Sequence, residues 1–180
     1  MAEGQAWRLV SSVFLHSGFV HLAFNMLSLY FLGSFVEVAF GRGRFLALYL
    51  LSGLSGGIAY LYFGGYATPA VGASGAIFGL LGAVLGYALR RGTFSWQNPV
   101  IRQLLILLAI NVYIGLSIPN ISNTAHMGGL AGGFVFGYLV APTVYSRKTA
   151  RALSPVLIVL AAETLLLGLW FFLGPLSFGD

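Results

Sequence analysis

The sequence predicts an all-α membrane protein, a polytopic bundle of transmembrane helices. Of its 180 residues, 58% are hydrophobic and only 7% are charged, and the mean hydropathy is +0.91. An ordinary soluble domain carries about 25% charged residues, so a water-soluble fold is excluded. The long apolar runs lack the strict alternation of transmembrane β-strands, which favours helices. We expect the protein to act in or at a lipid bilayer.

Six apolar segments are long enough to be membrane spans, since a helix rises 1.5 Å per residue and the hydrocarbon core is about 30 Å thick. Two of these segments contain the uninterrupted apolar runs LLILLAI (in residues 102–118) and VLIVLAA (in residues 155–173), and arginines precede the segment at residues 45–63. The six predicted spans are residues 17–36, 45–63, 70–89, 102–118, 124–144 and 155–173.

Basic residues predict the orientation of these spans. Eight of the nine follow the first, third and fifth spans, and only Arg8 lies on the other side. The positive-inside rule places those three connections in the cytoplasm. The formal net charge of +5 is then a topology signal, and nucleic-acid binding has no support. The compact chain without a recognisable targeting signal favours a bacterial plasma membrane. The eight are Arg42, Arg44, Arg90, Arg91, Arg102, Arg147, Lys148 and Arg151.

The first span carries a polar face, which we expect to point into the protein and away from lipid. His21 and Asn25 are four residues apart and therefore share one side of a helix, which Ser28 continues. An imidazole and an amide beside a reacting carbonyl can donate to a developing oxyanion. The alternative is a buried polar cluster that fixes the helix register.

Glycines predict that the third and fifth spans pack closely. Both spans have small residues at steps of three and four, which form one stripe along a helix and let backbones approach in lipid. His126 continues the stripe of the fifth span. The glycines are Gly72, Gly75, Gly79, Gly82 and Gly86 in the third span and Gly129, Gly133 and Gly137 in the fifth.

Ser74 and His126 are predicted to lie at matching depth on this pair of helices. Ser74 is five residues after Pro69 and His126 is six after Asn120, or roughly 7 Å and 9 Å along the helices. A hydroxyl and an imidazole in contact suit nucleophilic catalysis. Alone, the serine would be a packing residue bonded to a carbonyl, and the histidine an interhelical donor. Shared depth and the glycine stripes favour the pair.

Acidic residues offer no third member of a catalytic triad. The only aspartate is Asp180 at the C-terminus, so we expect a Ser–His dyad. Glu163 is expected to make an interhelical hydrogen bond, and Glu37 to pair with a nearby arginine. The chain has no cysteine, which excludes disulfides, Cys-ligated metals and a thiol nucleophile. No metal or cofactor is required.

Three motifs, in this order, resemble the rhomboid family of intramembrane serine proteases. WRLVSSVFLHSGFVHLAFN, from Trp7 to Asn25, is similar to the loop-to-helix pattern of the family. GASGAIFG, from Gly72 to Gly79, is similar to its nucleophile motif, and AHMGGLAGG, from Ala125 to Gly133, to its base motif. The resemblance covers nearly the whole chain up to about residue 145.

The resemblance implies a role for each matching residue. Ser74 would be the nucleophile and His126 the general base and acid. His21, Asn25 and the Ser74 backbone amide would hold the oxyanion. Phe78, where the family usually has Tyr, would stack against His126. The supporting residues would be His16, Gly72, Gly129 and Gly133.

The resemblance also implies a domain plan and a substrate. Residues 1–145 would form a rhomboid-like core that lacks the first helix of the family, and residues 146–180 would add a C-terminal span. The substrate would be a transmembrane segment of another protein, cut near its outer end by a site that opens to the extracytoplasmic side.

Two other functions are considered. A catalytically silent binder of membrane helices would keep the fold, although such proteins normally lose the serine or the histidine. A transporter or metal site built from the three histidines is disfavoured, because HExxH is absent and no carboxylate shares their depth. The oligomeric state has no signal in the sequence.

Overall fold

The computed structural model describes residues 5, 7–64, 70–119, 121–141 and 149–173, without the side chains of 149–153. Pro69, Asn120, Arg147, Lys148 and Asp180 lie outside the described residues, as does the predicted boundary between residues 145 and 146. That division into a core and an added span therefore stays a prediction.

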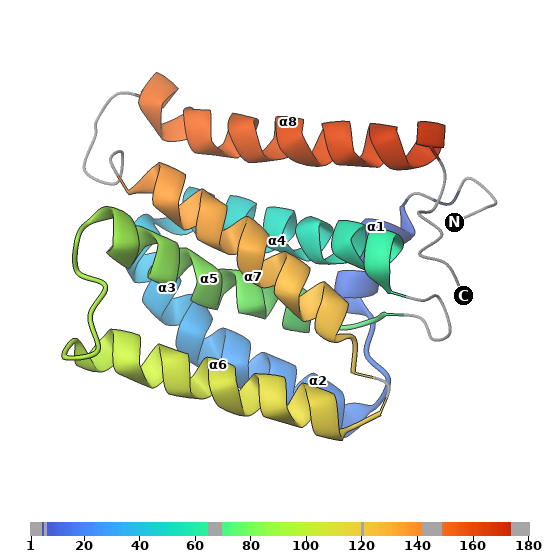
Figure 1. The fold of residues 1–180 in the computed structure, drawn as a ribbon, viewed down its shortest axis with the longest axis horizontal. Coiled ribbons are helices and arrows are strands. Elements are labelled where there is room, and N and C mark those ends of the chain that lie inside the picture. Colours follow the sequence, from blue (N-terminus) through green and yellow to red (C-terminus); the bar gives the residue numbers. More distant parts are fainter. Residues whose placement is uncertain (1–4, 6, 65–69, 120, 142–148, 174–180) are drawn as a thin grey trace.

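Helices make up most of the described chain (Figure 1). A single long helix consists of α2, a π-helical segment η2 and α3, and it runs from Phe19 to Phe40. In chain order the elements are α1 (Arg8–Ser11), the 3-10 turn η1 (Ser12–Phe14), α2 (Phe19–Ser28), η2 (Leu29–Gly33), α3 (Ser34–Phe40), α4 (Arg42–Phe63), α5 (Ser74–Arg90), α6 (Pro99–Ser117), α7 (Asn123–Val140) and α8 (Thr149–Leu173).

Each of the six predicted segments overlaps a helix, which confirms the all-helical fold class for the described residues. Four helices are long and apolar enough to cross a membrane: Phe19–Phe40, Arg42–Phe63, Pro99–Ser117 and Ser154–Leu173. The protein is thus an integral membrane protein. The helix α5 has 17 residues and is also apolar. That all six helices span the bilayer stays a prediction.

The start of α5 corrects the expected depth of Ser74. Ser74 is the first residue of the helix, not five residues into it. Gly72 has a φ of +122° and its backbone N–H donates to the Ser12 carbonyl at 2.9 Å, so the chain before Ser74 is not helical. Gly72 is therefore outside the glycine stripe. His126 is the fourth residue of α7 and lies in its first turn.

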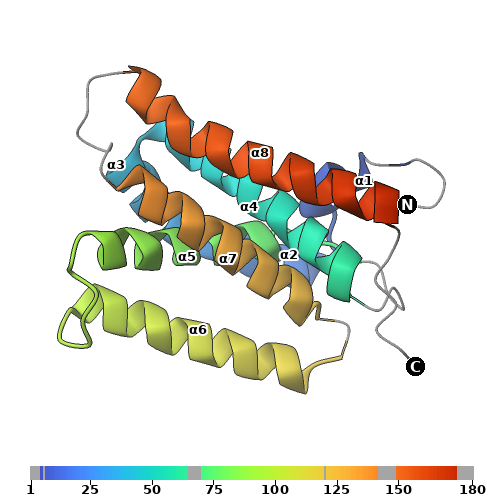
Figure 2. The same cartoon turned by 45° about the horizontal axis from the view of Figure 1, so that its top comes forward.

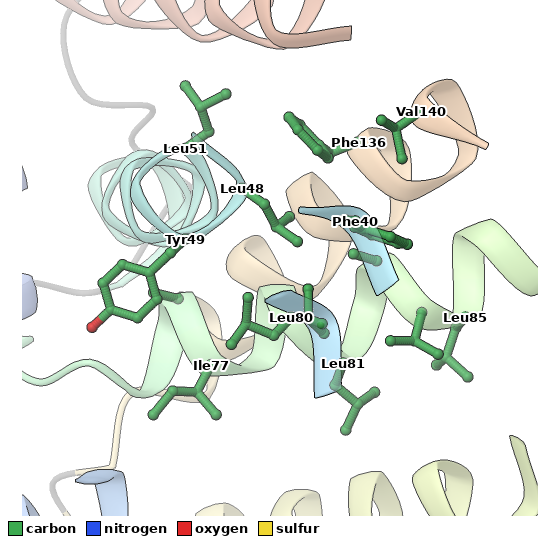
Figure 3. Packing of buried hydrophobic residues seen from close by; sticks show 14 of the residues in the cluster. Phe40, Leu48, Tyr49, Leu51, Ile77, Leu80, Leu81, Leu85, Phe136 and Val140 are labelled. Atoms are coloured by element: carbon green, nitrogen blue, oxygen red, sulfur yellow. The ribbon is translucent and has the colours of Figure 1, made fainter. Parts of the chain in front are cut away.

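The helix α5 forms the centre of the bundle. Thirteen of its residues are buried, and α4, α7, the α2–η2–α3 helix and α6 surround it (Figures 1 and 2). Side chains from all of these segments meet in one apolar core, where Leu80 and Leu48 are completely buried; Figure 3 shows part of it. By contrast, α6 touches α5 and α7 over a small area. The central helix therefore holds Ser74 on a rigid support.

The prediction that α5 and α7 pack closely is confirmed, because they are the most extensively packed pair. Glycines let their backbones touch. A Cβ added at Gly129 would collide with the carbonyl of Gly75, and one added at Gly137 would collide with that of Ala83. The reverse holds from α5, where a Cβ at Gly82 would strike the carbonyl of Leu130. The contact is thus backbone against backbone.

Gly133→Ala is expected to destabilise the protein by about 1–3 kcal/mol, the usual cost of overpacking. The new Cβ would lie 2.5 Å from the Cα of Gly79, and backbone cannot rotate away as a side chain can. Thermal unfolding in detergent measures the effect. Gly168→Ala is the matched control, since a Cβ on that helical glycine meets nothing within 4 Å. Equal melting temperatures for the two variants would contradict the close packing.

The last helix, α8, lies on the outside against α4 and α7 (Figures 1 and 2). Glu163 is buried and accepts a hydrogen bond from Ser55 of α4 at 2.5 Å. Tyr62 of α4 donates to the Leu166 carbonyl at 2.7 Å, and Trp170 donates to the Leu61 carbonyl at 3.3 Å. The expectation that Glu163 makes an interhelical hydrogen bond is confirmed.

The described arginines of the connections gather at one end of the bundle. There α3 meets α4, α5 ends and α6 begins (Figure 1). Arg42 pairs with Glu37 at 3.1 Å, as expected, and Arg90 donates to the hydroxyl of Tyr138 at 3.0 Å. The helices α5 and α7 begin at the opposite end, near α1. Ser74 and His126 therefore lie far from the arginine-rich end.

Candidate active site

The segment before α2 fixes the backbone that leads to Ser74. Leu9 and Val13 are buried, and they fill the space beside two glycines of α4, Gly57 and Gly53. This packing holds α1 against α4 and places Val13 of η1 beside the same helix. The Ser12 carbonyl accepts the hydrogen bond from the Gly72 N–H. Contacts made 60 residues earlier in the chain thus place the turn that precedes the candidate nucleophile.

Ser74 and His126 are in hydrogen-bond contact. The Oγ of Ser74 and the Nε2 of His126 are 2.7 Å apart. Ser122 caps α7, since its side chain accepts from the Ala125 N–H and its carbonyl from the His126 N–H. The helix α4 also packs closely against the first turn of α7. A Cβ added at Gly56 would lie 2.7 Å from the Ala125 carbonyl oxygen. The histidine is therefore positioned by its own cap and by two neighbouring helices.

Phe78 stacks on the imidazole of His126, with ring centroids 4.3 Å apart and an interplanar angle of 9°. It is one turn beyond Ser74 on α5, so nucleophile and stacking ring come from the same helix. The Nδ1 of His126 is buried and has no hydrogen-bond partner among the described residues. Among the described residues, stacking by Phe78 orients the imidazole, and no carboxylate is bonded to its Nδ1.

His21 and Asn25 face the turn before Ser74. A Cβ at Gly72 would lie 2.7 Å from Cε1 and 2.9 Å from Nε2 of His21, and 3.8 Å from the amide nitrogen of Asn25. Gly72 is thus required twice, for its positive φ and for this close approach. Asn25 is buried and donates one amide N–H to the His21 carbonyl at 2.9 Å. Its second N–H is available to a ligand.

The start of α5 adds backbone donors to the site. The first hydrogen bond that closes this helix runs from the Ile77 N–H to the Ala73 carbonyl. The amides of Ser74, Gly75 and Ala76 precede it, and such first-turn N–H groups have no acceptor within their helix. The dipole of a helix also favours negative charge at this end. The His21 imidazole and the Asn25 amide line the same cavity as this first turn of α5.

A cavity of about 1000 Å³ contains this cluster. Ser74, His126, His21 and Asn25 all line it. Its other walls are mainly apolar and come from α2 and from the end of α6, including Phe24 and Ile118. The polar groups thus occupy one part of a largely apolar space.

Of the predicted site residues, Gly72 lines the cavity together with the four polar residues, whereas Phe78, Gly129, Gly133 and His16 do not. His16 packs edge-on against His21 with centroids 5.2 Å apart, and its Nε2 is buried without a hydrogen-bond partner in the described ranges. Ser17 was missed by sequence reasoning: its Oγ lies 3.0 Å from the Nδ1 of His21. The four-residue spacing could have indicated it. Within the described chain, no three histidine and carboxylate groups gather as metal ligands.

Comparison with known proteins finds a family and curated relatives. The family model "Rhomboid domain" matches residues 3–143. "Rhomboid protease GluP" of Bacillus subtilis (strain 168) is 41% identical over 162 residues, which cover 90% of this chain and 31% of that protein. "Putative rhomboid protease YdcA" of the same organism is 39% identical over 144 residues, 77% of this chain and 69% of that protein.

A plant relative shows the same match. "RHOMBOID-like protein 5" of Arabidopsis thaliana is 40% identical over 140 residues, 77% of this chain and 45% of that protein. The match thus spans less than half of the length of two of these relatives, 31% for GluP and 45% for RHOMBOID-like protein 5. Because the family model matches well over half of the 180 residues, the chain belongs to the rhomboid family.

Proposed function

We propose that this protein is an intramembrane serine endopeptidase that works with a dyad of Ser74 and His126. The observation that carries the proposal is the 2.7 Å contact between Ser74 Oγ and His126 Nε2, at the wall of a large and mostly apolar cavity. Family membership and two relatives that are named as rhomboid proteases support it.

In the first half of the reaction, Ser74 Oγ attacks the carbonyl carbon of a peptide bond and His126 Nε2 takes the serine proton. The carbonyl oxygen becomes negative and receives N–H groups from His21, Asn25 and the Ser74 backbone. His126 then gives its proton to the leaving nitrogen as the C–N bond breaks. An ester of Ser74 with the new carboxyl end remains.

In the second half, a water molecule gives a proton to His126 and attacks the ester carbon. The proton returns to Ser74 Oγ as the ester bond breaks, which restores both residues. Phe78 keeps the imidazole plane in place through both proton transfers, since it stacks on the ring. None of these proposed steps uses a metal or a cofactor.

The substrate we propose is a transmembrane segment of another protein, cut near its outer end. The cavity supports this, because side chains of α2 and α6 give it apolar walls while its polar groups lie near the helix starts. The arginine-rich end of the bundle lies opposite the end at which α5 and α7 begin. By the positive-inside rule that end is cytoplasmic, so the site opens to the extracytoplasmic side, in our proposal of a bacterial plasma membrane.

The test uses the 180-residue protein in liposomes with a tagged single-span membrane protein. We expect cleavage within the outer half of the span, and we expect a fluorophosphonate to stop it as mass spectrometry shows the adduct on Ser74. Undiminished cleavage by protein that is fully modified at Ser74 would contradict the dyad. A silent binder would retain the substrate without cutting it and would not form the adduct.

A further inference from the structure

We propose that Ser17 is a positioning residue that sets the tautomer of His21. Its hydroxyl donates to Nδ1 of the imidazole and so leaves the proton on Nε2, where it can be given to the oxyanion. The inference rests on the proposed function, and it assigns a role to a residue other than the four that carry the dyad and the oxyanion donors.

The two nitrogens of His21 face different surroundings. Nδ1 is 3.0 Å from the Oγ of Ser17. The opposite edge of the ring, with Cε1 and Nε2, lies against Gly72, two residues before the nucleophile. Both Ser17 and His21 line the cavity that contains Ser74. The ring therefore lies between a hydroxyl on one side and the reacting groups on the other.

Only one neutral tautomer of His21 can serve the reaction. A neutral imidazole carries a single N–H, and its other nitrogen is an acceptor. If Nδ1 held the proton, the Nε2 lone pair would point toward the developing negative charge and raise the barrier. If Ser17 donates to Nδ1, Nε2 holds the proton and stabilises that charge.

The position of Ser17 supports this role over ordinary helix capping. Serines just before a helix usually accept from its first N–H groups. Here the N-cap of α2 is Gly18, with no side-chain cap, and the hydroxyl of Ser17 contacts the imidazole instead. The bond from Asn25 to the His21 carbonyl holds the backbone of the same turn, and the edge of His16 limits rotation of the ring.

The first measurement is the ¹⁵N spectrum of histidine-labelled protein, which distinguishes the two tautomers by the chemical shifts of the ring nitrogens. The chain has three histidines, so each signal can be assigned with single variants. We expect the Nε2–H form for His21 in the wild type and in Ser17→Thr, which keeps the hydroxyl. In Ser17→Ala we expect the Nδ1–H form to appear.

The second measurement is the rate of cleavage. Ser17→Ala is expected to lower kcat about three- to tenfold with KM unchanged, which is the effect of one hydrogen bond. Ser17→Thr should restore kcat. In a His21→Ala background the Ser17→Ala change should have no further effect, because there is no ring left to orient.

Three results would overturn the proposal: the Nδ1–H form in the wild type, an unchanged tautomer in Ser17→Ala, or an equal loss of kcat with and without His21. The last result would mean that Ser17 only supports the fold, and thermal unfolding of each variant checks this directly. If the wild type shows no cleavage that depends on Ser74, the proposed function fails, whereas the spectrum still decides whether Ser17 sets the tautomer.

Discussion

Replacing His126 by Ala is expected to lower the rate at which a fluorophosphonate labels Ser74 by a factor of about 10³ or more. Without the imidazole at 2.7 Å, the hydroxyl keeps its proton and is a poor nucleophile. Ser74→Ala should show no labelling, because the reacting oxygen is gone. Both variants should also lose cleavage of a membrane substrate. Labelling is measured by fluorescence in a gel over a time course.

Ser117→Ala is the matched control for the serine. Ser117 is exposed on α6 and its hydroxyl donates to the Tyr113 carbonyl at 2.8 Å, within its own helix. This variant should be labelled at the wild-type rate. If His126→Ala were folded and labelled as fast as the wild type, the histidine would not be activating the serine, and the dyad would have to be abandoned.

The second large effect is the loss of kcat when either oxyanion donor is removed. His21→Ala and Asn25→Ala are each expected to lower kcat by about 10²–10³, the usual loss for one such donor, with little change in KM. The physical reason is that the donors strengthen only when the carbonyl oxygen becomes negative. Cleavage rates over a range of substrate concentration in liposomes separate the two constants.

Asn111→Ala is a close control for Asn25→Ala. Both amides donate to the carbonyl four residues earlier, at 2.8 Å for Asn111 and 2.9 Å for Asn25. Only Asn25 also lines the cavity beside Gly72. Equal effects of the two changes on kcat would favour the alternative that Asn25 merely fixes helix register. A selective loss with Asn25→Ala supports the oxyanion role.

Local patterns in the sequence were sufficient for the helices and for the main pair of residues. Uninterrupted apolar runs predicted all six long helices, because burial in lipid requires a continuous apolar surface. Glycine spacing predicted the contact between α5 and α7. The contact between Ser74 and His126 followed from depth along these helices, even though the predicted start of α5 was wrong.

The error at α5 has a specific physical cause. The residues before Ser74 are small and apolar, and nothing local distinguishes them from helix. Their conformation depends on the bond from Gly72 to the Ser12 carbonyl and on the ring of His21. Both partners are distant in the sequence, so hydropathy cannot detect them.

The sequence by itself determined the class of protein, the helices and the residues with chemical potential, because these depend on composition and on spacing along one helix. Only the tertiary structure decided how those residues meet. Phe78 lies flat on His126, Nδ1 of His126 has no partner among the described residues, and Ser17 contacts His21. Each of these contacts depends on side-chain direction and on how segments pack, which spacing along a single helix does not specify.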